Sequence, residues 1–158
     1  MKRKQIYLCW TLAISLLPSA FADGFERVYK KVGDQSLYMA SGPVIRKIKF
    51  RINIVDWRID CSESRAVVWG QARDPTPPGV PPYAKVYTVD LNKMKILSSY
   101  STTRGPHDAE FSLDRKKILI DEILMDFQSG KFIENYSAED LMFQREDCKD
   151  FEGRRLLR

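Results

Sequence analysis

Few side chains of this sequence could support acid–base, nucleophilic or metal chemistry. His107 is the only histidine, and no Cys-x-x-Cys pair is present. The chain also has no G-x-S-x-G elbow, phosphate-binding loop, H-E-x-x-H pair or dinucleotide-binding glycine pattern. Because zinc sites take most of their ligands from closely spaced histidines and cysteines, we expect no metal and no cofactor.

Two pairs of carboxylates are the remaining candidates for acid–base chemistry. Asp108 and Glu110 lie two residues apart where a strand is predicted to begin, and alternate strand positions would put them on one face, while Asp121 and Glu122 are adjacent. A glycosidase needs two carboxylates across a cleft, and a calcium loop needs acidic ligands spaced around a glycine. Acidic residues are common beside turns, so we predict that the protein is not an enzyme. The alternative is a small hydrolase that depends on His107.

The N-terminus has the three parts of a secretory signal. Residues 2–4 are basic, Ile6–Leu17 is mostly apolar, and Ala20–Ala22 has small residues at the cleavage positions. The apolar run is shorter than the roughly 20 residues that span a bilayer. We therefore expect cleavage after Ala22 and a periplasmic protein. Residues 23–158 should form a single β domain, with no membrane anchoring after cleavage.

Cys61 and Cys148 are the only cysteines left after that cleavage. Two cysteines in an oxidising compartment favour one disulfide, although two free thiols are the alternative. The bridge would tie an early strand to the C-terminal segment. Closing so long a loop would stabilise the fold by about 4–5 kcal/mol in the chain-entropy model.

Alternation of apolar and polar residues predicts a mostly β, antiparallel chain, and it is clearest in Ile48–Ile54. A short C-terminal helix is expected from Ala138 to about Glu146, with Ser137 as its N-cap. The other expected strands are Phe25–Val32, Leu37–Ala40, Asp56–Asp60, Ala66–Gly70, Lys85–Leu91, Lys95–Tyr100, Ala109–Ser112, Lys117–Ile120, Ile123–Phe127 and Lys131–Tyr136. Short strands at this spacing fit a sandwich, a barrel or propeller-like blades.

Charge and loop composition narrow the possible partners. The formal net charge is +5, and the first half of the chain is more basic than the second. The basic residues lie at alternating strand positions in an exported chain, which favours a solvated strand face, so we expect no nucleic-acid partner. Arg73–Tyr83 is rich in proline and should form a stiff surface loop. Ser101–Asp108 is a second, polar loop.

Two segments resemble the repeated strand–turn–strand of β-propeller blades. Phe111–Ile120 resembles the F-S-x-D-G hairpin, with Arg115 in place of the usual turn glycine, and Met125–Lys131 resembles the hairpin that follows it. Val86–Lys95 looks like a degenerate earlier copy. A closed propeller needs at least four blades, so we expect two or three blade-like sheets packed together.

A longer resemblance runs from about Trp69 to Tyr136. Its features, in chain order, are Asp74-Pro75, the proline-rich loop ending at Pro81-Pro82, the strand at Val86-Tyr87, the loop Ser101–Gly105, and Phe111-Ser112 with Asp114. This order resembles the periplasmic immunity proteins that neutralise peptidoglycan amidases of type VI secretion systems. The resemblance implies a partner, a secreted amidase toxin, and inhibition by a loop that enters its active-site cleft.

The resemblance further implies which residues touch that partner. In the family a hydroxyl side chain hydrogen-bonds the catalytic histidine of the amidase. The matching residues here are Ser101, Thr102, Thr103, Arg104, Gly105, His107 and Asp108. The same residue types are ordinary in turns. A structural loop on a propeller-like envelope binding module is therefore the alternative, and Pro75–Tyr83 is a second candidate contact.

Overall fold

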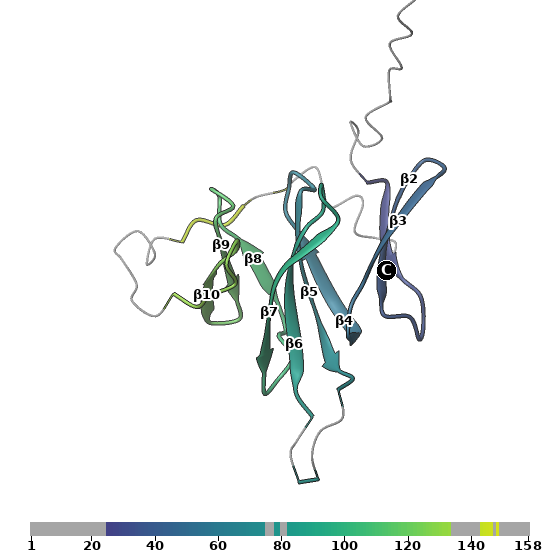
Figure 1. Cartoon of the computed structure of the whole chain (residues 1–158). Helices are drawn as coiled ribbons and strands as arrows, with labels where there is room; N and C mark the ends of the chain where they lie inside the picture. Colours follow the sequence, from purple (N-terminus) through teal and green to yellow (C-terminus); the bar gives the residue numbers. More distant parts are fainter. Residues whose placement is uncertain (1–24, 75–77, 80–81, 134–142, 147, 149–158) are drawn as a thin grey trace, which may run out of the picture.

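Figure 1 shows a computed structural model of the chain, which describes residues 25–74, 78–79, 82–133, 143–146 and 148. The predicted signal sequence lies outside these residues. The described part consists of antiparallel strands and contains no helix. It therefore holds no helix long and apolar enough to cross a membrane. The strands are β1 (Arg27–Lys30), β2 (Ser36–Ser41), β3 (Val44–Lys49), β4 (Ile52–Ile59), β5 (Arg65–Ala72), β6 (Ala84–Asp90), β7 (Lys95–Thr102), β8 (Ala109–Phe111), β9 (Lys117–Ile120) and β10 (Ile123–Asp126).

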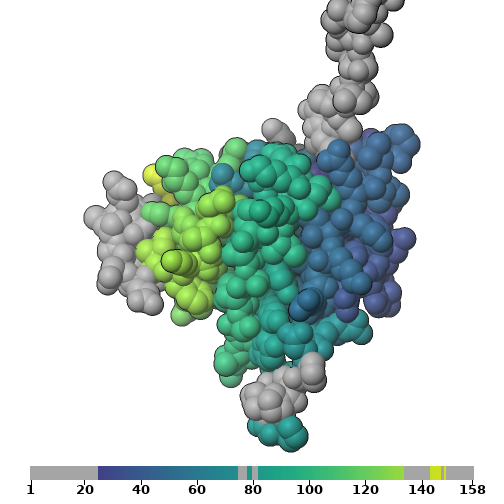
Figure 2. Space-filling view, viewed as in Figure 1, coloured from purple at the N-terminus to yellow at the C-terminus, as the bar shows by residue number. Residues whose placement is uncertain are grey.

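The strands form three sheets, each a meander of neighbours in the sequence. Sheet A has the order β1-β2-β3, sheet B has β4-β5-β6-β7, and sheet C has β10-β9-β8. The sheets lie side by side in Figures 1 and 2, with sheet B in the middle. The prediction of a mostly β, antiparallel chain is confirmed, and the number of sheets agrees with the two or three expected.

Two apolar cores hold the three sheets together, and both use the central strand β5. Ala66 and Val68 belong to the core that sheet B shares with sheet A. Val67 and Trp69 belong to the core shared with sheet C. Successive strand residues point to opposite faces, so a strand covered on both faces reads as a continuous apolar run, as Ala66–Trp69 does.

The prediction of a single strand at Ile48–Ile54 is wrong in one respect. The chain leaves sheet A at Lys49 and enters sheet B at Ile52, so the segment belongs to two sheets. Between them, the Phe50 amide donates to the Gln35 carbonyl at 2.8 Å. Ile48, Phe50, Ile52 and Ile54 all enter the same core, so the apolar alternation continues although the sheet changes.

The edges of sheet C differ from expectation. Lys131–Tyr136 is expected as a strand, but residues 131–133 contribute one isolated bridge, Phe132 to Met125, and residues 134–136 are not described. The expected helix falls mainly on residues 138–142, which also lie outside the described part. The described residues 143–146 are not helical. Arg145 pairs with Ser112, and the Glu146 amide donates to the Phe111 carbonyl at 3.0 Å, which extends sheet C beyond β8.

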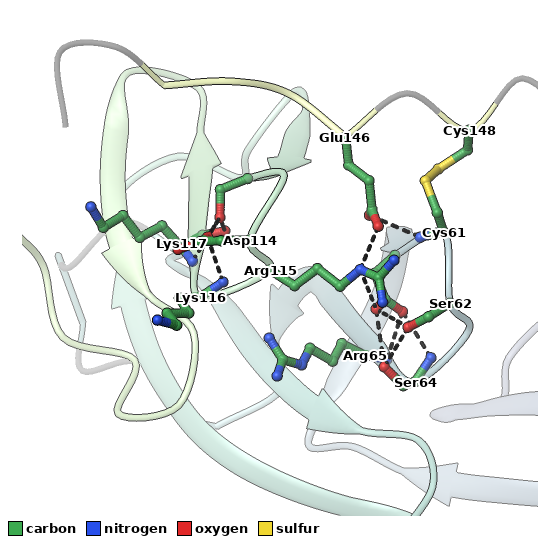
Figure 3. Close-up of polar contacts among 12 residues, drawn as sticks. Cys61, Ser62, Ser64, Arg65, Asp114, Arg115, Lys116, Lys117, Glu146 and Cys148 are labelled. Atoms are coloured by element: carbon green, nitrogen blue, oxygen red, sulfur yellow. Dashed lines mark hydrogen bonds and ion pairs between the residues drawn. A yellow bond between two sulfur atoms is a disulfide. The ribbon is translucent and has the colours of Figure 1, made fainter. Parts of the chain in front are cut away.

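The turn after β8 keeps the backbone of a blade hairpin without its glycine. Arg115 has a φ of 58°, in the left-handed region that favours glycine. Its side chain offsets part of that strain, because Nε lies 2.6 Å from Glu146 Oε1 and 4.0 Å from the buried Asp60 carboxylate. The same residue therefore shapes the turn and joins sheet C to the β4–β5 turn and the C-terminal segment (Figure 3).

A disulfide completes this connection. Cys61 follows β4 and is bonded to Cys148, with 5.4 Å between their Cα atoms. Next to it, the Cys61 amide donates to Glu146 Oε2 at 2.9 Å. Asp60, which is fully buried, accepts hydrogen bonds from Ser62, Ser64 and Arg65 and holds the turn in shape. The predicted bridge is thus confirmed, and Figure 3 shows it beside these polar contacts.

Candidate functional site

The polar loop predicted to bind a partner connects sheets B and C. Ser101 and Thr102 are the last residues of β7, and residues 103–108 lead to β8. Thr102 Oγ1 donates to the Arg104 carbonyl at 2.8 Å, which turns the chain out of the strand. Ser101, Thr103, Arg104, Gly105 and His107 are exposed, and we call these five residues the loop tip.

The base of the same loop is tied to the fold. Pro106 is buried. The amides of His107 and Asp108 both donate to Asp121 Oδ1, at 3.0 and 3.1 Å. The Asp108 carboxylate accepts from Arg58 Nε at 2.8 Å, and Arg58 Nη2 lies 2.7 Å away. Asp108 therefore holds the loop in place, whereas the tip carries the free side-chain surface.

The neck of the proline-rich loop lies beside the loop tip. In the β6–β7 register Lys85 is opposite Ser101. The Lys85 ammonium pairs with the Asp74 carboxylate, and the Tyr83 hydroxyl donates to the same carboxylate at 3.1 Å. The prolines at 75, 77 and 81 lie outside the described residues. The described part thus brings the two candidate loops to one end of sheet B.

This ion pair shifts the pKa of both Asp74 and Lys85. Hydrogen bonds from Lys85 and then from Tyr83 hold the pKa of the Asp74 carboxyl below its ordinary value of 3.8. The hydrogen bond to Asp74 raises the pKa of Lys85 above its ordinary 10.5. Both groups are therefore charged over the whole neutral range, and the neck of the loop is fixed by a charge-assisted contact.

Replacing Asp74 with asparagine is expected to make the free energy of unfolding depend less on pH in the acid range. A lowered pKa means that the carboxylate stabilises the folded state above pH 3.8, and that this contribution is lost as the pH falls through the folded-state pKa. The difference in unfolding free energy between native protein and Asp74→Asn should be largest near neutral pH and vanish in acid. Urea unfolding across that range measures it.

Lys85→Met gives the matching alkaline arm of the experiment. Since the folded-state pKa of Lys85 is raised, its contribution is fully present below pH 10.5 and is lost as the pH rises further. A stability difference that stays constant with pH in either variant would show that the ion pair is not the cause.

An aromatic pair that the sequence interpretation missed includes a residue near the end of β7, on the opposite face of the strand from Ser101. Tyr100 directly precedes Ser101, and its ring meets that of Phe132 edge-on with 5.1 Å between centroids. Phe132 is 45 % exposed. Burial, followed by the charge of Asp121, raises the pKa of Tyr100 above its ordinary range, so its hydroxyl stays protonated. Their only sequence signal is the aromatic residue type.

One of the two carboxylate pairs considered for acid–base chemistry, Asp108 and Glu110, is engaged by arginines. Asp108 and Glu110 do line one cavity of about 170 Å³, together with Arg58 and Arg145. Asp108 pairs with Arg58, and Glu110 Oε2 lies 2.8 Å from Arg145 Nε. Each of these carboxylates is already engaged by an arginine, an arrangement that suits a structural role better than proton donation.

One group in the described residues has the composition of a metal site. Ligand atoms of Cys61, Glu146 and Cys148 lie within 4.8 Å of one another. The two sulfur atoms are bonded to each other, so neither is available as the thiolate that a metal would need. Glu146 is already bound by Arg115 and by the Cys61 amide. The disulfide accounts for this group.

The residues that fix the loop differ in how visible they are from sequence. Asp121 has a φ of 51°, and an aspartate between two short apolar runs is a recognisable turn signal. Arg58 contacts Asp108 across 50 positions of sequence, and no local pattern predicts such a contact.

No family model matches the chain, and a search of curated proteins gave no significant match.

Proposed function

We propose that this protein is a periplasmic immunity protein that binds and inhibits a secreted cell-wall amidase. The observation that carries the proposal is an exposed, hydroxyl-rich loop tip on a fixed base. The tip residues are exposed, while Pro106 is buried and Asp108 is held by Arg58. A loop that is ordered before binding loses less conformational entropy when it enters a cleft.

The chemistry of the tip fits an amidase of the Cys–His kind. The hydroxyls of Ser101 and Thr103 can both donate and accept hydrogen bonds, so either could engage a catalytic imidazole. Arg104 could pair with carboxylates at the cleft rim. The Tyr100–Phe132 pair offers partly exposed aromatic surface, the kind that often contributes most of the affinity in protein interfaces.

Two further features support an exported inhibitor. The sequence begins with the parts of a secretory signal, and the Cys61–Cys148 bridge is of the kind that persists in oxidising compartments. The carboxylates in the described cavity are paired with arginines, which supports a role in binding more than in catalysis.

The direct test is a titration of peptidoglycan cleavage by a candidate amidase toxin, chosen as the product of any secreted-toxin gene that adjoins this one. The proposal expects activity to be lost at one-to-one stoichiometry and the two proteins to co-elute on a sizing column. Because self-protection leaves little room for free toxin, the complex should be nanomolar or tighter. Undiminished cleavage with separate elution would exclude inhibition of that toxin and favour the alternative, a non-catalytic envelope binding module.

Substituting arginine into the loop tip should abolish this binding without unfolding the protein. Ser101→Arg and Thr103→Arg each add bulk and charge to an exposed side chain that must enter a cleft, and we expect affinity to fall by about 100-fold or more. Isothermal titration calorimetry measures the loss. Gln128→Arg is the matched control, because Gln128 is exposed in the turn after β10, at the opposite end of sheet C from Asp121.

The two arms of this experiment separate two errors. If the native protein inhibits and both tip variants bind normally, the loop assignment is wrong although the inhibitor function stands. If Gln128→Arg weakens binding as much as the tip variants do, the loss reflects added charge rather than contact at the tip.

A further inference from the structure

The outer face of sheet A has an ordered arrangement of cations that the loop-based function does not use. Leu37 and Met39 of β2 point into the core, so their neighbours along β2 face away from sheet B. The strand register aligns Tyr29, Tyr38 and Lys47 in one row of this outer face. In Figure 2 sheet A forms the flank of the molecule away from sheet C.

Four exposed cations surround the central tyrosines. Lys47 and Lys49 lie on the outer face of β3, Arg27 lies on β1, and Lys31 follows β1. Alternate residues of a strand are about 7 Å apart, so the two β3 lysines form a closely spaced pair. None of the four forms a salt bridge with another residue of the described chain.

The tyrosines position these cations. The rings of Tyr29 and Tyr38 are stacked with 5.3 Å between centroids. The Arg27 guanidinium lies 4.8 Å from the centre of the Tyr29 ring, and the Lys31 ammonium lies 4.8 Å from the centre of the Tyr38 ring. Asp34, the acid next to them, is bound by the Tyr38 hydroxyl. Asp34 keeps its negative charge, but the four cations outnumber it, so the charge of this group of residues is positive.

Exposed aliphatic side chains lie at both ends of this face. Ile45 is 58 % exposed and shares the row of Arg27, at the β2–β3 turn. Val32 is fully exposed in the β1–β2 turn at the other end. Cations alone would suit any polyanion. Aliphatic side chains beside them gain little against a hydrated glycan or a phosphate backbone, whereas they gain free energy in the interface of a lipid bilayer.

We infer that the outer face of sheet A binds reversibly to the surface of a membrane that contains anionic phospholipid. Lys47, Lys49, Arg27 and Lys31 face the phosphate groups, while Ile45 and Val32 enter the headgroup region. This is peripheral binding and involves no inserted segment. It is independent of the inhibitor function, because it uses sheet A and leaves the loop tip at the end of sheet B.

The test is co-sedimentation of the purified protein, without its predicted signal sequence, with lipid vesicles. Vesicles of phosphatidylcholine mixed with phosphatidylglycerol should bind the protein, and phosphatidylcholine alone should not. A basic residue near an anionic membrane contributes a several-fold gain in partitioning, so the Lys47→Glu/Lys49→Glu variant should lose about tenfold or more. Lys95→Glu/Lys131→Glu is the charge-matched control, because it reverses two exposed lysines outside sheet A, one in β7 and one after the turn that follows β10.

A second pair of substitutions distinguishes lipid from other polyanions. Ile45→Ser and Val32→Ser should weaken vesicle binding severalfold while leaving the net charge unchanged, because they remove the apolar contribution. The inference is overturned if the protein fails to bind anionic vesicles, if the control variant loses as much binding as Lys47→Glu/Lys49→Glu, or if the serine variants bind vesicles normally. Binding to purified peptidoglycan but not to vesicles would make an anionic glycan the occupant. Circular dichroism checks that each variant is folded.

Discussion

Reduction of the Cys61–Cys148 disulfide is expected to lower the free energy of unfolding by about 4 kcal/mol or more. The bridge joins residues separated by 87 positions. A crosslink over a loop of that length removes about 4–5 kcal/mol of conformational entropy from the unfolded chain. That is a large share of the 5–15 kcal/mol typical of a folded domain. The reduced protein should therefore be only marginally stable.

The polar contacts around the bridge cannot replace it. Glu146 lies 2.6 Å from Arg115, but the Arg115 side chain is 41 % exposed, and ion pairs in contact with solvent are worth about 1 kcal/mol or less. The backbone bonds of Gln144 and Glu146 to Leu113 and Phe111 hold only a short segment. The covalent bond is what keeps this segment beside sheet C.

Urea unfolding with and without reductant measures the effect in the native protein. The variant Cys61→Ser/Cys148→Ser should have the low stability of the reduced protein, and adding reductant to it should change nothing. This second comparison separates the loss of the bridge from any other action of the reductant. An unfolding free energy that reductant leaves unchanged would contradict the expected role of the bridge.

The fold was predictable from sequence where the signal was local. The strict alternation at Ile48–Ile54 correctly marked residues of one core, because side chains of an extended chain alternate whichever sheet they belong to. For the same reason it could not show that the chain changes sheets at Phe50–Arg51. Sheet membership depends on which strands pair, and that is settled by contacts distant in sequence.

In the candidate site, too, the features with a local sequence signal were predictable, and the contacts distant in sequence were not. The loop tip was visible as a run of turn residues, Ser101–Gly105, and the disulfide was visible from the only two cysteines that follow the predicted signal sequence. The partner of Asp108 was not visible, because Arg58 comes from another sheet. Nor was the second role of Arg115, in which a residue that departs from the blade pattern becomes the link to Glu146.

Replacing Gly70 with alanine is expected to destabilise the protein by about 3 kcal/mol or more, at the upper end of the effects of overpacking a core. Gly70 lies in β5 opposite Ile54, where the register of β4 shifts. A Cβ atom at this position would lie 2.0 Å from the Asn53 carbonyl oxygen and 2.9 Å from the Ile54 Cα. Both are backbone atoms of the paired strand, so no side-chain rotation relieves the clash.

The expected consequence reaches the loop as well as the core. Moving β4 away from β5 would displace Arg58, which holds Asp108 at the base of the loop. Thermal and urea unfolding measure the loss of stability. Gly105→Ala is the matched control, because a Cβ there would lie 3.7 Å from the Ala84 Cβ, an ordinary contact. It should leave stability nearly unchanged. Equal stabilities for Gly70→Ala and Gly105→Ala would mean that β4 and β5 can separate without loss, and that this contact does not set their spacing.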